Sequence, residues 1–527
     1  MRRSDMIQSV KQRSEPWDFI IIGGGATGLG VAVDAANRGY STLLVEMDDF
    51  AKGTSSRSTK LVHGGIRYLQ QGNVSLVLDA LKERNRLLNN APHLVHSQPF
   101  LIPNYRWWEK SFYGFGMKIY DTLAGKQGFG RSKRLSRTET LERASTLSSK
   151  KLKGGVLYYD GQFDDSRLAI NLAETSAEKG GVLINYMKVT GLLKNGGKVY
   201  GVKVKDALSG KDYEIKGRTV INATGVFTDS VLQLDDRDAK PIISPSQGIH
   251  LVLDKKFLPG NTAIMVPHTD DGRILFAVPW HNKVVLGTTD TAVNTISTEP
   301  KAMHAEIDFL LKHATGYLAV SPGYDDIKSV FAGLRPLVKA SNNKKTAKIS
   351  RDHTLIISDS GLVTITGGKW TTYRKMAQDV VDQASDAAGL PSVKCTTENL
   401  RIHGWQKDVN TEDPLHIYGT DQAGIKEIVA ENPEWGSLLH KRLPYIKAEV
   451  IWAIRNEMAM TVEDFNARRS RALLLDASAS EEMAPEVARL MAEEAGYDDN
   501  WVKKQLKEYY DLVSWYKYSE NKHPVER

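Results

Sequence analysis

The stretch that decides the fold covers residues 18–46 and reads DFIIIGGGATGLGVAVDAANRGYSTLLVE. Its apolar run at residues 19–22 predicts a buried strand, and the small residues at 26–37 predict a helix. A second apolar run, at residues 42–45, ends in the acid Glu46. The order of strand, glycine turn, helix, strand and acid is that of a dinucleotide-binding unit.

Three glycines in this stretch follow the order G-x-G-x-x-G. Gly23 permits a tight turn, Gly25 lets the backbone approach a pyrophosphate, and Gly28 lets the helix pack close to the strand. The start of the helix then offers free N–H groups and a partial positive charge to the phosphates. Glu46 lies 18 residues after Gly28, which suits an acid that binds a ribose hydroxyl. An acid at this place favours FAD or NAD over NADP.

The size and composition of the chain set wide limits on function. Its 527 residues allow two or three domains, and 41% hydrophobic with 25% charged residues is typical of a globular protein. A formal charge of +7 favours phosphorylated substrates, anionic lipid surfaces or nucleic acid, without choosing among them. The single cysteine, Cys395, excludes a disulfide within one chain and indicates a reducing compartment. The sequence shows no metal-ligand cluster and no apolar run long enough to span a membrane.

Residues 1–16 carry four basic side chains and no apolar core. This composition is unlike a secretory signal peptide, and we expect a flexible leader.

Two later segments carry unusual composition. Residues 54–68, TSSRSTKLVHGGIRY, combine hydroxyl side chains with paired glycines. They predict either a plain surface turn or a loop beside the cofactor, at the carboxyl edge of the sheet where ligands bind. Residues 104–137 mix aromatic and basic side chains. This mixture suits a membrane interface, and packing of the rings on the core is an equally good interpretation.

The middle of the chain predicts a return to the nucleotide sheet. Three β-type runs, at residues 188–193, 198–205 and 212–216, are separated by hairpin signals. Residues 219–222 then predict another strand of the nucleotide sheet, and the turn from Ala223 to Gly225 can approach the cofactor closely.

The remainder divides into a sheet-rich and a helical part. Residues 241–290 predict an antiparallel sheet. The strand at 362–365 is followed by Gly367-Gly368-Lys369 and a helix from about Thr371, which repeats the logic of an anion cradle. Beyond about residue 390 the chain reads as helical, with the clearest helices at 448–476, 485–495 and 500–518.

Several sequence blocks together resemble the membrane-associated, FAD-dependent glycerol-3-phosphate dehydrogenases of the D-amino-acid-oxidase-like superfamily. The blocks are IIGGGATGLG (21–30), SSRSTKLVHGGIRYL (55–69), NATG (222–225), RILFAVPW (273–280), LGTTD (286–290), AGLRPL (332–337), SRDH (350–353), TGGKWTTYRKMA (366–377) and EMAMTVEDFNARRSRALLLDA (457–477).

This resemblance implies an α/β fold in which a Rossmann-like FAD-binding domain carries an antiparallel-sheet substrate (cap) region, followed by a C-terminal α-helical domain. The implied bounds are 17–390 for the oxidoreductase domain, with FAD-binding segments at about 17–90, 150–235 and 340–390, cap segments at about 91–149 and 236–339, and the helical domain at 391–527.

The resemblance also implies an activity, namely oxidation of sn-glycerol 3-phosphate to dihydroxyacetone phosphate, with electrons passing through FAD to a membrane quinone. The implied location is cytoplasmic, with peripheral attachment to the anionic inner face of the membrane, and a homodimer is an open expectation. An oxidase that uses oxygen and an amine or amino-acid oxidase are the alternative enzymes. A basic flavoprotein that binds RNA is a rival of another class, and the sequence shows no RNA-binding motif for it.

The family motifs also imply the site residues. His250 is the predicted base, because imidazole titrates near neutral pH. Arg335 and Lys369 are predicted to act with it in catalysis and, together with Arg67 and Tyr68, in binding the substrate. The residues predicted to bind FAD are Gly23, Gly25, Gly28, Glu46, Ser55, Ser56, Ala223, Gly225, Gly368 and Thr371.

Overall fold

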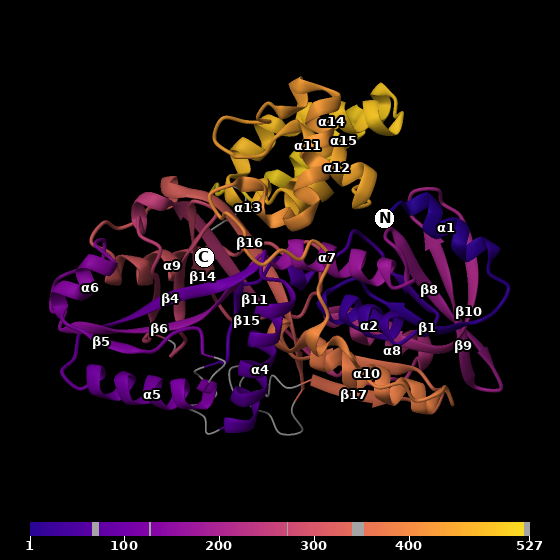
Figure 1. Cartoon of the computed structure of the whole chain (residues 1–527), viewed down its shortest axis with the longest axis horizontal. Helices are drawn as coiled ribbons and strands as arrows, with labels where there is room; N and C mark the ends of the chain where they lie inside the picture. Colours follow the sequence, from indigo (N-terminus) through magenta and orange to yellow (C-terminus); the bar gives the residue numbers. More distant parts are fainter. Residues whose placement is uncertain (66–72, 126–127, 271, 340–352, 521–527) are drawn as a thin grey trace.

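A computed structural model describes residues 1–65, 73–125, 128–270, 272–339 and 353–520. Two large sheets lie side by side, and the helices α11 to α15, drawn in orange to yellow, lie above the place where they meet (Figure 1). The largest apolar core follows the same arrangement, because it runs from β1 (Trp17–Ile22) through α10 (Tyr373–Ala387) into α12 (Lys447–Asn456) and α14 (Ala477–Ala495). The helical part therefore shares a core with the nucleotide-binding part.

The first sheet is the predicted nucleotide sheet. Its strand order is β17-β18-β10-β1-β2-β7, and all neighbours along it are parallel except β17 and β18. Helix α2 (Ala26–Asn37) packs against both α10 and α7 (Asp165–Glu178). The predicted strand, helix and strand of residues 19–45 are confirmed. The other strands are β2 (Thr42–Val45), β7 (Val182–Ile184), β10 (Asp212–Asn222), β17 (His353–Ile357) and β18 (Val363–Gly367).

Strand β10 belongs to two layers. Its first half pairs antiparallel with β9 (Lys198–Asp206), which pairs in turn with β8 (Met187–Asn195). Its second half pairs parallel with β1 in the nucleotide sheet. The predicted meander is confirmed, but the predicted break between residues 216 and 219 is wrong. One continuous strand runs through both segments, and its hydrogen-bonding partner changes from β9 to β1 along its length.

The second sheet is the predicted antiparallel region. Its order is β15-β11-β14-β13-β12-β4-β6-β3, with β16 paired to β11 and β5 paired to β6. The pair β12 and β4 is parallel, and α9 (His304–Tyr317) packs against β11. The strands are β3 (Leu61–Val62), β4 (Val95–Asn104), β5 (Lys133–Leu135), β6 (Gly154–Phe163), β11 (Ile243–Asp254), β12 (Ala263–Val266), β13 (Leu275–Trp280), β14 (Lys283–Gly287), β15 (Thr291–Ala292) and β16 (Ile327–Val338).

Two helices cover one side of this sheet, α4 (Val74–Asn90) and α5 (Glu109–Ala124). In α5 the aromatic side chains divide between two faces: Tyr113 and Tyr120 are buried, whereas Phe112 and Phe115 are more than half exposed. Packing of rings on the core is therefore confirmed for the inner face of α5, and the membrane interface stays a prediction for its outer face. Within the described ranges, no helix combines the length and the apolar character that crossing a membrane requires.

The beginning of the chain differs from the sequence prediction. The expected flexible leader is wrong for residues 3–12, which form α1 (Arg3–Gln12). The Arg3 guanidinium donates to Asp206 at 2.7 Å and to the carbonyl of Asn185, and Met6 packs on the apolar core. These contacts fix a helix whose composition alone does not require burial.

The C-terminal part is helical as predicted, but the single helix expected at 448–476 is wrong. It is divided into α12, a π-helical turn at Asp464–Arg469 and α13 (Ala472–Leu475), and Arg471 before α13 has φ +66°. The reason is buried charge: both Arg468 and Arg469 turn inward to Asp49, which lies just after β2. The other helices are α11 (Gln422–Glu431), α14 and α15 (Asp499–Val513). The boundary near residue 390 stays a prediction.

Candidate active site

The glycine turn between β1 and α2 has no space for side chains. Gly23 has φ +110°, a backbone conformation that favours glycine, and a Cβ on Gly28 would lie 1.9 Å from the Gly23 carbonyl oxygen. Helix α2 can therefore approach the turn only because residue 28 is glycine. The predicted reasons for Gly23 and Gly28 match this geometry.

Two predicted FAD residues, Glu46 and Ser55, hold the backbone of this turn by hydrogen bonds. The Glu46 carboxylate accepts hydrogen bonds from the Gly24 N–H at 2.5 Å and the Asp48 N–H at 2.9 Å. Ser55 Oγ accepts from the Ala26 N–H at 2.9 Å, at the start of α2, and Gly25 lies next to this hydroxyl. Desolvation in the turn raises the pKa of Glu46 to about 7. Contact of Glu46 with a ribose hydroxyl stays a prediction.

The other predicted FAD residues lie where parallel strands end. Ala223 and Gly225 follow β10, and Gly368 and Thr371 follow β18. The carboxyl ends of parallel strands meet at one edge of a sheet, where ligands bind in open α/β folds. Ser56 lies in the short helical turn Thr54–Ser56 beside the same edge; a neighbouring tryptophan, Trp370, donates its indole N–H to the Ser55 carbonyl at 2.8 Å.

Two adjoining cavities lie between this edge and the second sheet. The larger, about 230 Å³, is lined by His250, Arg335, Gly368, Lys369 and Thr371, all of them predicted site residues. The smaller, about 180 Å³, shares Arg335 with it. The structure thus brings together three predicted catalytic residues and two predicted FAD residues. The predictions for Arg67 and Tyr68 lie outside the described residues.

His250 lies in β11 and is 2% exposed. Its ring stacks on Phe331 at 4.9 Å, and its Nε2 lies 2.9 Å from Thr59 Oγ1. Burial, followed by the charges of Lys60 and Arg335, holds the pKa of His250 well below its usual range. The imidazole is therefore neutral at neutral pH and can accept a proton.

Arg335 is fixed in β16 by the loop that follows β14. Its Nη2 donates to Thr288 Oγ1 at 3.0 Å and to the Thr289 carbonyl at 2.9 Å, and Asp290 lies 3.5 Å from its Nη1. Lys369 precedes the short helical turn Trp370–Thr372 on the opposite, FAD-side wall. Two cations from separate elements thus reach one cavity, which is an arrangement that can hold a phosphate.

Sequence reasoning missed several residues that line these cavities. Thr59 contacts the predicted base, Thr288 anchors Arg335, and Arg273 lines the smaller cavity. Each lies inside a block that carries the family resemblance. No sequence signal distinguishes Thr59 from the other hydroxyl residues of its loop.

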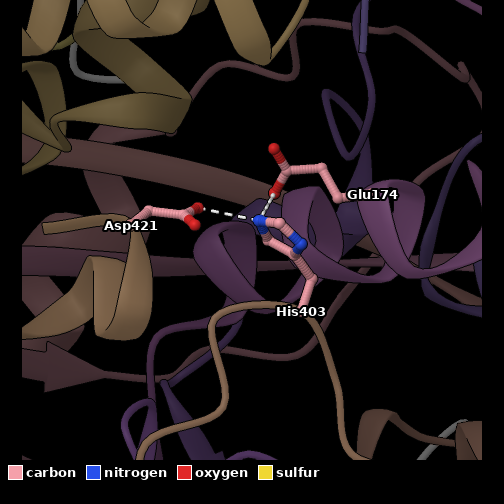
Figure 2. Close-up of side chains that lie close together, drawn as sticks. All are labelled: Glu174, His403 and Asp421. Carbon is pink, nitrogen blue, oxygen red and sulfur yellow. Dashed lines mark hydrogen bonds and ion pairs between the residues drawn. The ribbon is translucent and has the colours of Figure 1, made fainter. Parts of the chain in front are cut away.

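A cluster of titratable groups lies away from the cavities. Glu174 of α7, His403 and Asp421 converge in Figure 2, although sequence reasoning expected no such cluster. His403 Nε2 lies 2.7 Å from Asp421 Oδ2 and 3.5 Å from Glu174 Oε2, and its Nδ1 lies 2.6 Å from Glu178 Oε1.

These distances favour a proton over a metal ion. Two ligand atoms bound tetrahedrally to zinc are separated by roughly 3.4 Å, which exceeds the 2.7 Å between His403 and Asp421. An ionised carboxylate only accepts hydrogen bonds, so the two ring nitrogens of His403, each beside a carboxylate, both donate. His403 is therefore a charged imidazolium that joins α7 to the segment before α11.

Comparison with known proteins agrees with the geometry. Residues 18–374 match the family described as FAD dependent oxidoreductase, and residues 361–502 match the C-terminal domain of alpha-glycerophosphate oxidase. A probable mitochondrial glycerol-3-phosphate dehydrogenase of Caenorhabditis elegans is 40% identical, over 96% of this chain and 74% of the relative. The mitochondrial glycerol-3-phosphate dehydrogenase of Homo sapiens is 38% identical, over 94% of this chain and 73% of the relative.

A solved structure extends the similarity to the whole fold. The glycerol-3-phosphate dehydrogenase of Bacillus halodurans, solved as a complex with FAD, superposes with a TM-score of 0.80 at 29% identity, covering 100% of this chain and 98% of that one. With the glycine turn, the parallel strand ends and the shared cavity, these matches establish the family. The chain belongs to the FAD-dependent oxidoreductases, in the group of the glycerol-3-phosphate dehydrogenases.

Proposed function

We propose that this chain oxidises sn-glycerol 3-phosphate to dihydroxyacetone phosphate on bound FAD and passes the electrons to a membrane quinone. The observation that carries the proposal is the 230 Å³ cavity, in which His250, Arg335 and Lys369 meet Gly368 and Thr371 from the FAD side. The relatives named glycerol-3-phosphate dehydrogenase support the choice of substrate.

The turn after β1 fits a dinucleotide, because a backbone free of side chains can approach a pyrophosphate. We assign FAD binding to the ten residues predicted above. Bound FAD supplies the acceptor for the hydride that leaves C2 of the substrate.

The protein's own groups divide the remaining chemistry. Arg335, held by Thr288, presents a fixed guanidinium to the phosphate, and Lys369 adds a second positive charge from the opposite wall. Neutral His250 takes the proton of the C2 hydroxyl, and the Thr59 hydroxyl, 2.9 Å from its Nε2, holds the ring in place. The same two cations stabilise the developing oxyanion.

The test is a visible spectrum recorded without oxygen. Adding sn-glycerol 3-phosphate should bleach the flavin bands within seconds, whereas the enantiomer sn-glycerol 1-phosphate and glycerol should leave them unchanged. A yellow protein that stays yellow with sn-glycerol 3-phosphate would refute the substrate. Bleaching by glycine or another amine instead would support the amine-oxidase alternative.

One comparison favours a second candidate, an oxidase, because the match at residues 361–502 carries an alpha-glycerophosphate oxidase description. The relatives named as dehydrogenases extend over more of the chain, so we prefer the quinone reaction. Turnover with a short-chain quinone and without hydrogen peroxide is the expected result. Stoichiometric peroxide release in air would reverse this choice.

Helix α5 supports attachment to a membrane. Trp107, just before it, is 86% exposed, and Phe115 and Phe112 on its outer face are 65% and 55% exposed, with Lys118 beside them. Exposed rings with cations suit the headgroup region of an anionic bilayer. We propose that this face attaches the protein peripherally to the inner, cytoplasmic side of the membrane.

Cosedimentation with vesicles tests this attachment. The protein should bind phosphatidylglycerol vesicles more tightly than phosphatidylcholine vesicles, and Phe115→Ser should reduce binding at least several-fold. The matched control is Val320→Ser, which removes another apolar side chain that is 62% exposed. Equal loss in both variants would argue against α5. The homodimer stays a proposal, which light scattering of the purified protein tests.

A further inference from the structure

The loop at residues 63–65 forms part of the wall of both cavities and has two anchors. His63 lines both cavities and Gly65 lines the smaller one. On the FAD side, the His63 N–H donates to Thr371 Oγ1 at 3.3 Å. On the other side, the Gly64 N–H donates to the hydroxyl of Tyr120 at 3.0 Å. Tyr120 therefore reaches the substrate site from α5 without lining either cavity.

All hydrogen-bonding positions of the Tyr120 hydroxyl are used. It donates to Asp160 Oδ2 at 2.8 Å and accepts from Gly64 and, at 3.5 Å, from Arg84 of α4. A hydroxyl has one donor and two acceptor positions, so these three contacts complete its capacity. Arg84 also donates to Asp160 Oδ1 at 2.7 Å. The cluster thus joins α4, α5, β6 and the loop.

The cluster is closed to solvent. Tyr120 and Asp160 are each 2% exposed, and Arg84 is 1% exposed. Burial and the charge of Asp160 hold the pKa of Tyr120 well above its usual range, so the hydroxyl keeps its proton. A buried N–H that loses its partner is costly. Tyr120 also packs closely on Gly64, because a Cβ at this position would lie 2.5 Å from the Tyr120 oxygen.

We propose that Tyr120 is a positioning residue for the substrate site: its hydroxyl holds Gly64, and through it the 63–65 loop, at the distance from Asp160 that shapes the smaller cavity. Asp160 lines that cavity, so one hydroxyl sets the separation of two of its walls. This inference rests on the proposed function, since it assigns Tyr120 a part in binding the same substrate.

The first test compares Tyr120→Phe with Tyr113→Phe. Tyr113 lies two turns earlier in α5, is also buried, and bonds its hydroxyl to His268 at 3.0 Å, so the control removes the same atom from the same helix. In anaerobic stopped-flow experiments, Tyr120→Phe should raise the apparent Kd for sn-glycerol 3-phosphate about three- to tenfold, as expected for one lost hydrogen-bond anchor. The limiting rate of flavin reduction should change less than about twofold.

A purely structural role would move the unfolding temperature and leave the Kd unchanged. The inference is overturned if Tyr120→Phe binds substrate like the parent, or if Tyr113→Phe shifts the Kd equally. Either result would refute the inference on Tyr120 and leave the proposed function standing, because the flavin of the parent is still bleached by the substrate. A parent protein that does not bleach would instead refute the proposed function.

A second measurement does not depend on substrate. Hydrogen exchange of the backbone amide of Gly64 should accelerate at least tenfold in Tyr120→Phe and remain unchanged in Tyr113→Phe. A third variant, Gly64→Ala, should raise the Kd in the parent but add less in the Tyr120→Phe background. The added Cβ meets the Tyr120 oxygen at 2.5 Å in the parent, and in the Tyr120→Phe background only its contact with Leu81, at 2.8 Å, remains. Unchanged exchange, or strictly additive effects on the Kd, would overturn the assignment.

Discussion

Replacing His403 by glutamine should make the stability of the protein less dependent on pH. Hydrogen bonds and charges from Asp421, Glu174 and Glu178 outweigh desolvation and raise the pKa of His403 from 6.5 to about 10. A histidine whose pKa is higher in the folded than in the unfolded state adds stability below its unfolded pKa, and this contribution is lost as the pH rises through the folded pKa. The window for His403 is therefore pH 6.5 to 10.

The size of the effect follows from the shift. At 1.36 kcal/mol per pKa unit, an interval from 6.5 to about 10 corresponds to roughly 4–5 kcal/mol for a side chain that is 20% exposed. Burial also raises the pKa of Glu174 to about 8, so the folded state keeps a proton on this carboxyl group that the unfolded state loses. Glu174 therefore also makes the protein less stable as the pH rises. Both groups therefore predict a decline of stability above pH 6.5.

Scanning calorimetry can measure this decline. An unfolding entropy of about 2.1 cal/mol/K per residue gives roughly 1 °C in Tm per kcal/mol for a chain of 527 residues. The Tm of the parent should therefore be about 4 °C higher than the Tm of His403→Gln at pH 6, and this difference should fall below about 1 °C at pH 10.5. The control, His440→Gln, removes a histidine paired with Glu482, an exposed carboxylate, and should cost less than about 1 °C. A difference between parent and His403→Gln that stays constant from pH 6 to 10.5 would refute the imidazolium.

Three further substitutions test the site. Gly28→Ala places a Cβ 1.9 Å from the Gly23 carbonyl oxygen and should yield colourless protein. The control Gly53→Ala, where no atom lies within 4 Å of the added Cβ, should stay yellow. Equal flavin content in the two variants would contradict the close approach of α2 to the glycine turn. His250→Ala should lower the rate of flavin reduction by roughly 10²–10⁴-fold. In the parent, this rate should not fall between pH 8 and 6, because a base with a lowered pKa stays unprotonated in that range. A parent rate that drops near pH 6.5 would indicate another base. Lys369→Ala should slow flavin reduction more than it weakens FAD retention, and an unchanged reduction rate would exclude Lys369 from the chemistry.

Local patterns predicted the nucleotide-binding part well. The strand, turn and helix of residues 19–37 were readable because glycine positions and apolar runs act over a few residues. The meander before β10 was readable for the same reason. The separation of residues 212–216 from 219–222 was wrong because the change of partner along β10 depends on strands far apart in the chain.

The two other errors in the fold share one cause, which is burial of charge. Periodicity predicted one helix at 448–476, since charged residues normally face solvent. In the structure Arg468 and Arg469 are buried against Asp49, more than 400 residues earlier, and the helix is broken around them. The leader failed similarly, because Arg3 finds Asp206 only in the folded protein.

The candidate site was predictable in its residue types and not in its supports. The family resemblance identified His250 and Arg335, and the structure places both on one cavity. Thr59 and Tyr120 could not be singled out, because the sequence does not show which atoms a hydroxyl group contacts in the folded protein. The same holds for His403, whose partners on α7 lie well over 200 residues away.

The order of strands in the nucleotide sheet has a consequence for biosynthesis. Strand β1, near the start of the chain, pairs with β10, and β10 pairs with β18. The sheet edge at which we propose that the cofactor binds is therefore complete only after Gly368 has been made. At roughly 5–20 residues per second, the ribosome needs about 20–70 s to reach that point. During this interval the apolar strands near the start have no complete sheet to join. FAD should therefore enter only after at least 368 of the 527 residues have been made, and a shortage of flavin should expose the newly made protein to chaperones and proteases.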